Sequence, residues 1–123
     1  MAKSSYPRSL RLAETVRRLV SEWLEDEQNA ERQPGLVTVT DVHVTPDLHH
    51  ATVYYTVLGT EEERADARAR LAEAAPQARA FVARQVRLRH APTLEFVSDD
   101  VPARAARIDQ ILEELAERPQ RPE

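Results

Sequence analysis

Residues 36–58 read LVTVTDVHVTPDLHHATVYYTVL, two runs rich in Val, Thr and Tyr in which apolar and polar side chains alternate. Alternation with a period of two, in β-branched and aromatic residues, predicts strands with one buried face. Between the runs, Pro46-Asp47 has the composition of a turn. We therefore expect strands over 36–45 and 51–58, paired antiparallel as a hairpin with a loop of about four residues.

The alternation in the first run changes phase. Val37 and Val39 occupy odd positions, whereas Val42 and Val44 occupy even ones. Because one face of a strand collects every second residue, an extra residue is needed for all four valines to face the same core. The phase change predicts a β-bulge near Thr40–Asp41.

Helical patterns flank the hairpin. Upstream, apolar residues recur at three- and four-residue spacing, which predicts an amphipathic helix of about five turns. They are Leu12, Val16, Leu19, Val20, Trp23 and Leu24. The polar stretch 26–35, which ends in Pro-Gly, is expected to form a loop. Downstream, Thr60 and Glu63 have the spacing of a capping box and predict the start of a second helix.

Pro76 lies within this second helical pattern. Because proline removes an amide donor and disfavours helical angles at Ala75, we expect the helix to kink or stop there. A third helix is expected to carry Phe81 on its apolar side and to end at residues 90–92. A short strand is then expected over 93–98.

Asp99 or Asp100 is expected to cap a last helix, with Pro102 in its first turn. The apolar stripe of this helix comprises Ile108, Ile111, Leu112 and Leu115. The order is thus helix, strand, strand, helix, kink, helix, strand and C-terminal helix, which predicts an α+β layer with helices packed on one face of a three-stranded sheet. We expect one domain over 6–117 with flexible tails at 1–5 and 118–123.

The composition excludes several classes of protein. With no Cys there is no disulfide framework, thiol nucleophile or cysteine-based zinc site. No apolar run approaches the roughly 18–20 residues that cross a bilayer, and Met1–Arg8 lacks the apolar stretch of a secretion signal. We therefore expect a cytoplasmic protein. No Gly-rich phosphate loop or Gly-x-Ser-x-Gly motif is present, so we expect no catalysis and no cofactor.

The segment Pro76–Leu94 carries positive charge on an acidic chain. It runs nineteen residues without one Asp or Glu, although the net charge of the chain is −4. Its basic residues are Arg79, Arg84, Arg87, Arg89 and His90. Because clustered arginines attract phosphate, the segment predicts a site for a polyanion. The alternative is a solvated helix face, because the chain has sixteen Arg and a single Lys and arginine is therefore common throughout.

Two other groups of residues are candidates for a metal site and for base stacking. His43, His49 and His50 cluster around the hairpin, but no carboxylate or Cys lies at a recognisable ligand spacing, so we expect no metal site. The aromatic residues on apolar faces, which we expect in the core, are Trp23, Tyr55, Phe81 and Phe96. Tyr54, on the opposite strand face from Tyr55, is the candidate for exposure and base stacking.

Several strings carry a family resemblance. They are VTVTDV at 37–42, PDL at 46–48 leading to ATVYY at 51–55, and RLR at 87–89 leading to PTLEF at 92–96. Asp99, followed by ARI at 106–108 and Leu112, is similar to the family's closing segment, and residues 8–24 are similar to its opening helix. In their order and spacing these strings resemble the ribosome-binding factor A family, over roughly residues 6–115. The resemblance implies a type II K-homology (KH) fold.

The resemblance also implies a function. Such a factor binds the small (30S) ribosomal subunit and its 16S rRNA during late maturation and rRNA processing, and matters most in the cold. Other KH domains hold nucleic acid with a Gly-x-x-Gly loop; the family has an Ala-x-Gly kink, whose place is taken here by Ala78-Arg79-Ala80, with Ala80 departing from the family's glycine. The RNA-binding residues expected on this basis are Arg79, Arg84, Arg87, Arg89, Arg8 and Arg11.

Two other functions stay open. One is a non-catalytic protein-interaction module that uses the acidic C-terminal helix. The other is a small enzyme with an unrecognised site. The expected partners are the small subunit and its rRNA, without a membrane, and the protein is expected to be a monomer off the ribosome.

Overall fold

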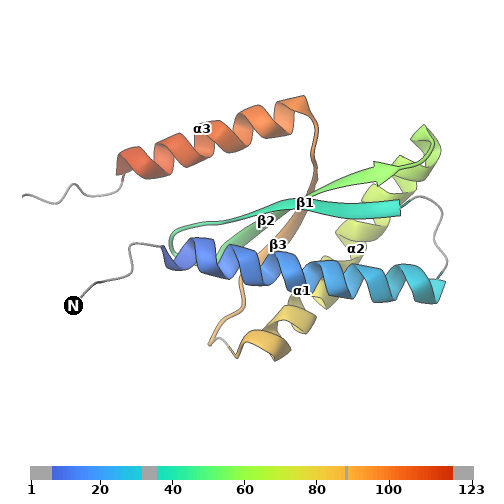
Figure 1. Cartoon of the computed structure of the whole chain (residues 1–123), viewed down its shortest axis with the longest axis horizontal. Coiled ribbons are helices and arrows are strands. Elements are labelled where there is room, and N and C mark those ends of the chain that lie inside the picture. The colour runs from blue at the N-terminus through green and yellow to red at the C-terminus, as the bar shows by residue number, and fades with distance from the viewer. Residues whose placement is uncertain (1–6, 32–35, 88, 118–123) are drawn as a thin grey trace, which may run out of the picture.

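The computed structural model describes residues 7–31, 36–87 and 89–117; the tails expected at 1–5 and 118–123 lie outside these ranges. Its elements, in chain order, are α1 (Arg8–Glu31), β1 (Leu36–Val44), β2 (His50–Leu58), α2 (Glu61–Val86), β3 (Thr93–Ser98) and α3 (Val101–Glu117). The α+β class, with three strands between helices, is confirmed (Figure 1).

The strands form one mixed sheet in the order β1-β2-β3. β1 pairs antiparallel with β2, and the register shifts between Val39 and Asp41, so the predicted β-bulge is confirmed. β3 pairs parallel with β2, with His50 opposite Thr93. Parallel strands need a crossover connection, which α2 supplies here. This pairing brings the hairpin turn and the segment before β3 to the same end of the sheet.

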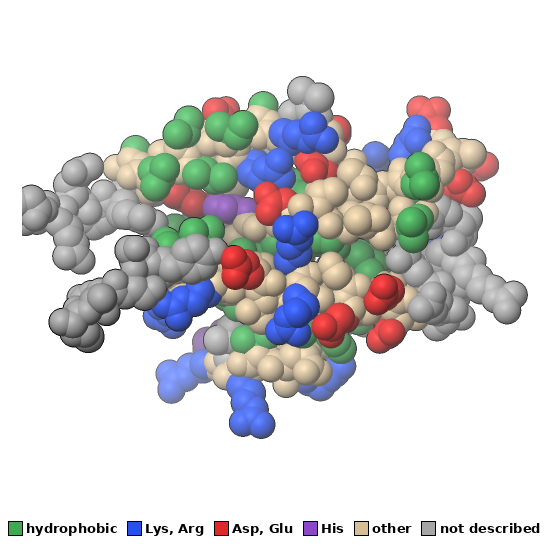
Figure 2. Space-filling view, in the orientation of Figure 1, with side chains coloured by type: hydrophobic (Ala, Val, Ile, Leu, Met, Phe, Trp, Pro, Cys, Tyr) green, Lys and Arg blue, Asp and Glu red, His purple; other side chains and the backbone are tan. Residues whose placement is uncertain are grey.

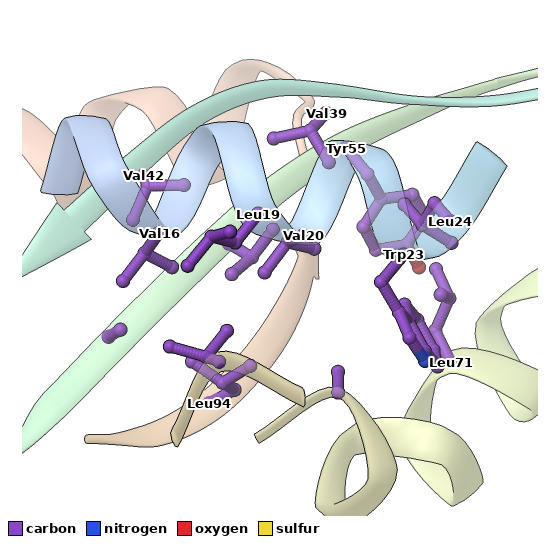
Figure 3. Close-up of a cluster of buried hydrophobic side chains, with 14 of the residues drawn as sticks. Val16, Leu19, Val20, Trp23, Leu24, Val39, Val42, Tyr55, Leu71 and Leu94 are labelled. Carbon is purple, nitrogen blue, oxygen red and sulfur yellow. The ribbon is translucent and has the colours of Figure 1, made fainter. Parts of the chain in front are cut away.

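The core lies between one face of the sheet and the two helices α1 and α2. Val16 and Val20 of α1, Val53 of β2 and Val82 of α2 are fully buried, and Leu94 of β3 packs in the same cluster (Figure 3). Burying one such side chain stabilises the fold by about 1.5–3 kcal/mol. The phase change at the bulge keeps the valines of β1 on this face.

The aromatic residues expected in the core pack there. The ring centroid of Phe96 lies 6.4 Å from that of Trp23 and 6.4 Å from that of Tyr55. The expectation that Tyr54 is exposed is wrong, because its side chain is buried under Arg107, whose guanidinium carbon lies 4.3 Å from the ring centroid. Tyr54 therefore offers no open ring face to a base.

Two helices extend further than their sequence patterns suggest. α1 continues to Glu31, into the stretch 26–35 that was expected to form a loop. α2 is continuous through Pro76, so the helix does not stop at the proline and the separate third helix expected after it is not found. A proline inside a helix costs about 3 kcal/mol. Ala78 and Val82, which follow it, are fully buried, and this packing outweighs the cost.

α3 lies against the opposite face of the sheet and contacts it through polar side chains (Figure 1). Arg107 forms ion pairs with Asp41 at 3.5 Å and with Asp99 at 3.7 Å. Nε2 of His43 lies 3.1 Å from Oε2 of Glu114. The expected packing of helices on one face of the sheet therefore holds for α1 and α2, whereas α3 covers part of the other face.

Candidate nucleic-acid interface

The C-terminal end of α2 positions the predicted basic segment. The helix ends at Val86, and Arg87 follows as a cap in the left-handed conformation, with φ 57° and ψ 39°. Its N–H donates to the carbonyl of Ala83 at 3.4 Å. The helix was expected to continue to His90. Instead, Arg87 and Arg89 lie on the connection between α2 and β3.

Arg79 ties this connection to the helix. Its guanidinium donates to the carbonyl of Ala91, from Nη2 at 2.9 Å and from Nε at 3.3 Å. Beside these bonds lies an open hollow of about 260 Å³ that Arg79, Arg89 and His90 line together with small side chains of α2. Two of the predicted RNA-binding arginines, with the neighbouring histidine, therefore meet at one concave surface.

Arg84 lies at the same end but points elsewhere. It is five residues from Arg79, which on a helix separates the two side chains by about 140° around the axis. Its guanidinium carbon stands 6.0 Å from the ring centroid of Phe81, at cation–π distance. Arg84 is thus held over an aromatic ring on the helix, apart from the hollow that contains Arg79 and Arg89.

Arg8 and Arg11 form a second basic group, at the first turn of α1. They line a hollow of about 210 Å³ with Leu48 of the hairpin turn. The same turn reaches the first group, because the carbonyl of His49 accepts from the N–H of Thr93 at 2.8 Å. The hairpin turn therefore lies between the two basic groups.

Asp47 is the acidic residue of this turn. Its carboxylate accepts from the Thr45 hydroxyl at 2.7 Å and from the His49 N–H at 2.9 Å. These two bonds lower the pKa of Asp47 below its ordinary value of 3.8, and the bond from Thr45 has the larger effect. The carboxylate is consequently an anion that organises the turn beside the arginines.

The residues expected at the family's kink lie inside the continuous helix α2. Ala78 is fully buried, Arg79 bonds Ala91, and Ala80 lines the hollow. Among the described non-glycine residues, positive φ occurs at Leu48 and Arg87. The methyl group of Ala80 therefore meets no conformational conflict, and the left-handed turn comes after the helix.

The two ends of the molecule differ in charge. The end just described carries Arg8, Arg11, Arg79, Arg84, Arg87 and Arg89 with the acids Glu14 and Asp47. The other end is formed by the C-terminal half of α1 and the N-terminal half of α2. It carries Glu22, Glu25, Asp26, Glu27, Glu61, Glu62, Glu63, Asp66 and Glu73 with Arg64, Arg68 and Arg70. In Figure 2, the surface at the C-terminal end of α2 shows basic side chains without acidic ones.

The described ranges hold neither a cluster of metal ligands nor a membrane-spanning helix. No group of three His, Cys, Asp or Glu there converges as metal ligands do. His43 is instead paired with Glu114, and His49 with Asp47 at 3.7 Å. None of the helices in those ranges has the length and apolar character needed to cross a membrane.

Sequence reasoning did not connect the hairpin turn with the basic segment. The two segments meet because β3 adds to β2 in parallel, from His50 opposite Thr93 onward. No local pattern marks this contact. The pairing direction of β3 would have predicted it, because that direction decides at which end of the sheet the segment before Thr93 lies.

Known proteins match this chain over most of its length. A family model described as Ribosome-binding factor A matches residues 8–112. Ribosome-binding factor A of Clavibacter michiganensis subsp. michiganensis is 43% identical over 92% of this chain and 68% of its own length. That of Kocuria rhizophila is 45% identical over 90% of this chain and 72% of its own length.

Solved structures resemble the fold. Ribosome-binding factor A from Thermus thermophilus superposes with a TM-score of 0.62 at 28% identity, over 73% of this chain and 93% of the other. A putative ribosome binding factor A from Thermotoga maritima gives 0.64 at 32% identity, over 81% and 93%. A Thermus thermophilus homology model fitted into the cryo-EM map of a 30S-RbfA complex gives 0.59 at 28% identity, over 69% and 88%. Sequence and fold agree, and the chain belongs to the ribosome-binding factor A family, with its KH-like fold.

Proposed function

We propose that the protein is an assembly factor that binds the 30S subunit through its 16S rRNA during late maturation and rRNA processing, including growth in the cold. Membership of the family supports this proposal, as does the relative that was fitted into a 30S-RbfA complex. The observation that carries it is the basic end, where the hairpin turn lies between two groups of arginines.

The mechanism is binding without a chemical reaction. The arginines of the basic end lie along rRNA phosphates, where guanidinium groups neutralise charge and release counterions. Tight binding to one rRNA conformation raises the population of that conformation. The protein works in the cytoplasm as a monomer when it is off the ribosome, and it needs no cofactor.

Salt dependence tests the electrostatic part of the proposal. If roughly four to six phosphates are neutralised, log affinity falls linearly with log salt with a slope of about −3 to −5. The measurement is a titration of labelled protein with purified small subunits at several potassium concentrations. A slope near zero would refute an interface made of phosphate contacts.

Charge reversal tests the residues. Arg84→Glu with Arg89→Glu alters two exposed side chains of the basic end and spares Arg79, which holds the Ala91 carbonyl. We expect this variant to keep its circular dichroism spectrum and to stop sedimenting with small subunits. The matched control is Arg64→Glu with Arg68→Glu, the same change of charge on exposed positions of α2 at the other end. Equal loss of binding in both variants would contradict the assignment.

A second function, the docking of another protein on α3, is favoured by one observation. The apolar stripe of α3 is exposed: Ile108 is 56%, Ile111 38%, Leu112 58% and Leu115 51% accessible. Leu112→Asp with Ile108→Asp should leave subunit binding unchanged if rRNA contact by the basic end is sufficient. Loss of subunit binding in this variant, with the basic end intact, would assign the interaction to α3.

A further inference from the structure

A second concave surface lies at the acidic end, where α1 and α2 approach each other. It is a cleft of about 460 Å³ between the C-terminal half of α1 and residues 67–77 of α2. Its floor is apolar and made by Trp23, Leu24, Val37, Ala67 and Leu71, which are 4–8% exposed. Figure 3 shows Trp23 and Leu24 of α1 beside Leu71 of α2.

The floor of the cleft belongs to the rigid core. The ring of Trp23 stacks on Phe96, with centroids 6.4 Å apart and an interplanar angle of 26°. Leu24 and Leu71 are members of the buried cluster that joins both helices to the sheet. The cleft is therefore preformed, and an apolar side chain that enters it is desolvated without rearrangement of the protein.

The rim of the cleft carries two carboxylates and one guanidinium, a net charge of −1. Glu27 of α1 and Glu73 of α2 line it from both sides, together with Arg70 and Gln77. Asp66, one helical turn before Arg70, is exposed on the same helix. An apolar floor between carboxylates fits an occupant that is apolar at its centre and positively charged at its flanks.

We propose that this cleft binds a protein segment in which an apolar side chain is flanked by Lys or Arg. The apolar side chain rests on Trp23 and Leu71, and the flanking cations meet the carboxylates of Glu27 and Glu73. The net negative charge of this end disfavours phosphate groups, so a basic protein segment fits the cleft better than a nucleic acid does. The inference is independent of the proposed function, which concerns the opposite end of the molecule.

The two surfaces can be occupied together. On α2, the cleft is lined by residues between Ala67 and Gln77, and the basic hollow by residues from Pro76 onward together with the following connection, so the two linings share no residue. One helix thus presents carboxylates to a basic protein segment and arginines to an anion. A partner made of basic protein and RNA would engage both ends in one orientation.

The fluorescence of Trp23 reports directly on the cleft, because it is the only tryptophan in the chain. The probe is a synthetic six-residue peptide with Leu-Phe between two pairs of Lys, titrated into the full chain. Its twin has Glu in place of Lys and the same apolar centre. We expect a saturable change of Trp23 emission with the Lys peptide, weakened by salt, and none with the Glu peptide.

Variants separate the rim from the floor. Glu27→Lys with Glu73→Lys should weaken binding of the Lys peptide about tenfold or more, because two attractive pairs become repulsive. The matched control, Asp109→Lys with Glu113→Lys on the exposed side of α3, carries the same change of charge and should leave affinity unchanged. Ala74→Leu narrows the cleft at a half-buried position and should weaken both Lys-peptide binding and the Trp23 response.

Three results would overturn the proposal. One is an equal response of Trp23 to the Lys and Glu peptides. Another is an affinity that does not change when Glu27 and Glu73 are reversed in a variant with native circular dichroism. The third is an amide chemical-shift map in which the Lys peptide perturbs α3 or the hairpin turn instead of residues 67–77.

Discussion

The two faces of the sheet hold their helices by different forces. On one face, α1 and α2 pack apolar side chains around Val16, Val53 and Val82, which are completely buried. On the other, α3 is held by Arg107 and Glu114, through ion pairs and one cation–π contact. A well-packed core does not depend on charge, whereas each ion pair of α3 needs both of its charged partners, and removing one partner of a largely shielded pair leaves the other charge without compensation. The apolar packing of α1 and α2 defines the fold. The attachment of α3 to the sheet depends in addition on the charge of a few side chains.

The strongest test of this difference introduces a charge into the packed face. Val53→Asp puts a carboxylate at a fully buried site, and we expect it to lower the free energy of unfolding by more than about 4 kcal/mol. Urea unfolding followed by circular dichroism measures the change. Thr56→Asp, at an exposed position on the same strand, is the control and should cost no more than about 0.5 kcal/mol. Similar losses in both variants would show that the two faces do not differ in this way.

A smaller effect is expected from the other face. Arg107→Met removes the cation that stacks on Tyr54 and pairs with Asp41 and Asp99. We expect amide hydrogen exchange in α3 to accelerate by about tenfold or more, while the unfolding midpoint of the rest of the domain changes little.

The control for this experiment is Arg68→Met, which removes an exposed cation from α2. It should leave exchange in α3 unchanged. Unfolding of the whole domain by Arg107→Met would contradict the view that α3 is attached to a fold that is stable without it.

The capping box of α2 allows a test on the packed face with an expected effect of about 1 kcal/mol on the free energy of unfolding. The Thr60 hydroxyl accepts from the Glu63 N–H at 3.1 Å, and the Glu63 carboxylate accepts from the Thr60 N–H at 2.8 Å. Thr60→Ala should lower the free energy of unfolding by about 1 kcal/mol without detaching α2, because the helix is also held by its packing. Thr15→Ala, which removes a hydroxyl from within α1, is the control and should have a smaller effect. Urea unfolding distinguishes them.

The smallest effect is expected from acid. The hydroxyl of Thr40 donates to Asp99 at 2.6 Å and, with the nearby Arg104 and Arg107, holds the pKa of Asp99 below its ordinary value of 3.8. Because the folded-state pKa is lowered, this stabilisation is fully present above about pH 4 and is lost as the pH falls through the folded-state value.

Hydrogen exchange in α3, corrected for its intrinsic pH dependence, should therefore accelerate as the pH falls below about 3.8. Asp99→Asn removes the titrating group and should abolish this step. A step of equal size in the variant would assign the acid sensitivity to another residue.

The elements of the packed face were predictable because their signals are local. The phase change from Val37 and Val39 to Val42 and Val44 predicts the bulge, and the pair Thr60 and Glu63 predicts the start of α2. Each pattern lies within a few residues of the feature it specifies. The same holds for the apolar spacing that predicts α1.

The features that were not predicted depend on residues far apart in the chain. Tyr54 is covered by Arg107, and no pattern near either residue reveals this contact. A proline would end or kink an isolated helix, but α2 continues past Pro76 because the turns that follow it are buried. The basic segment was recognised from charge alone, but its division into a hollow at Arg79 and a separate Arg84 follows from where the helix ends.

The parallel pairing of β3 with β2 has a consequence for synthesis of the chain. Leu94 and Phe96 complete the core, yet they are translated after the entire crossover helix, whereas α1 and the hairpin emerge early. A nascent chain that ends before Thr93 exposes valines that later become buried, and contacts between distant segments form slowly. Until translation has passed β3, the unfinished apolar face is a surface to which a chaperone can bind.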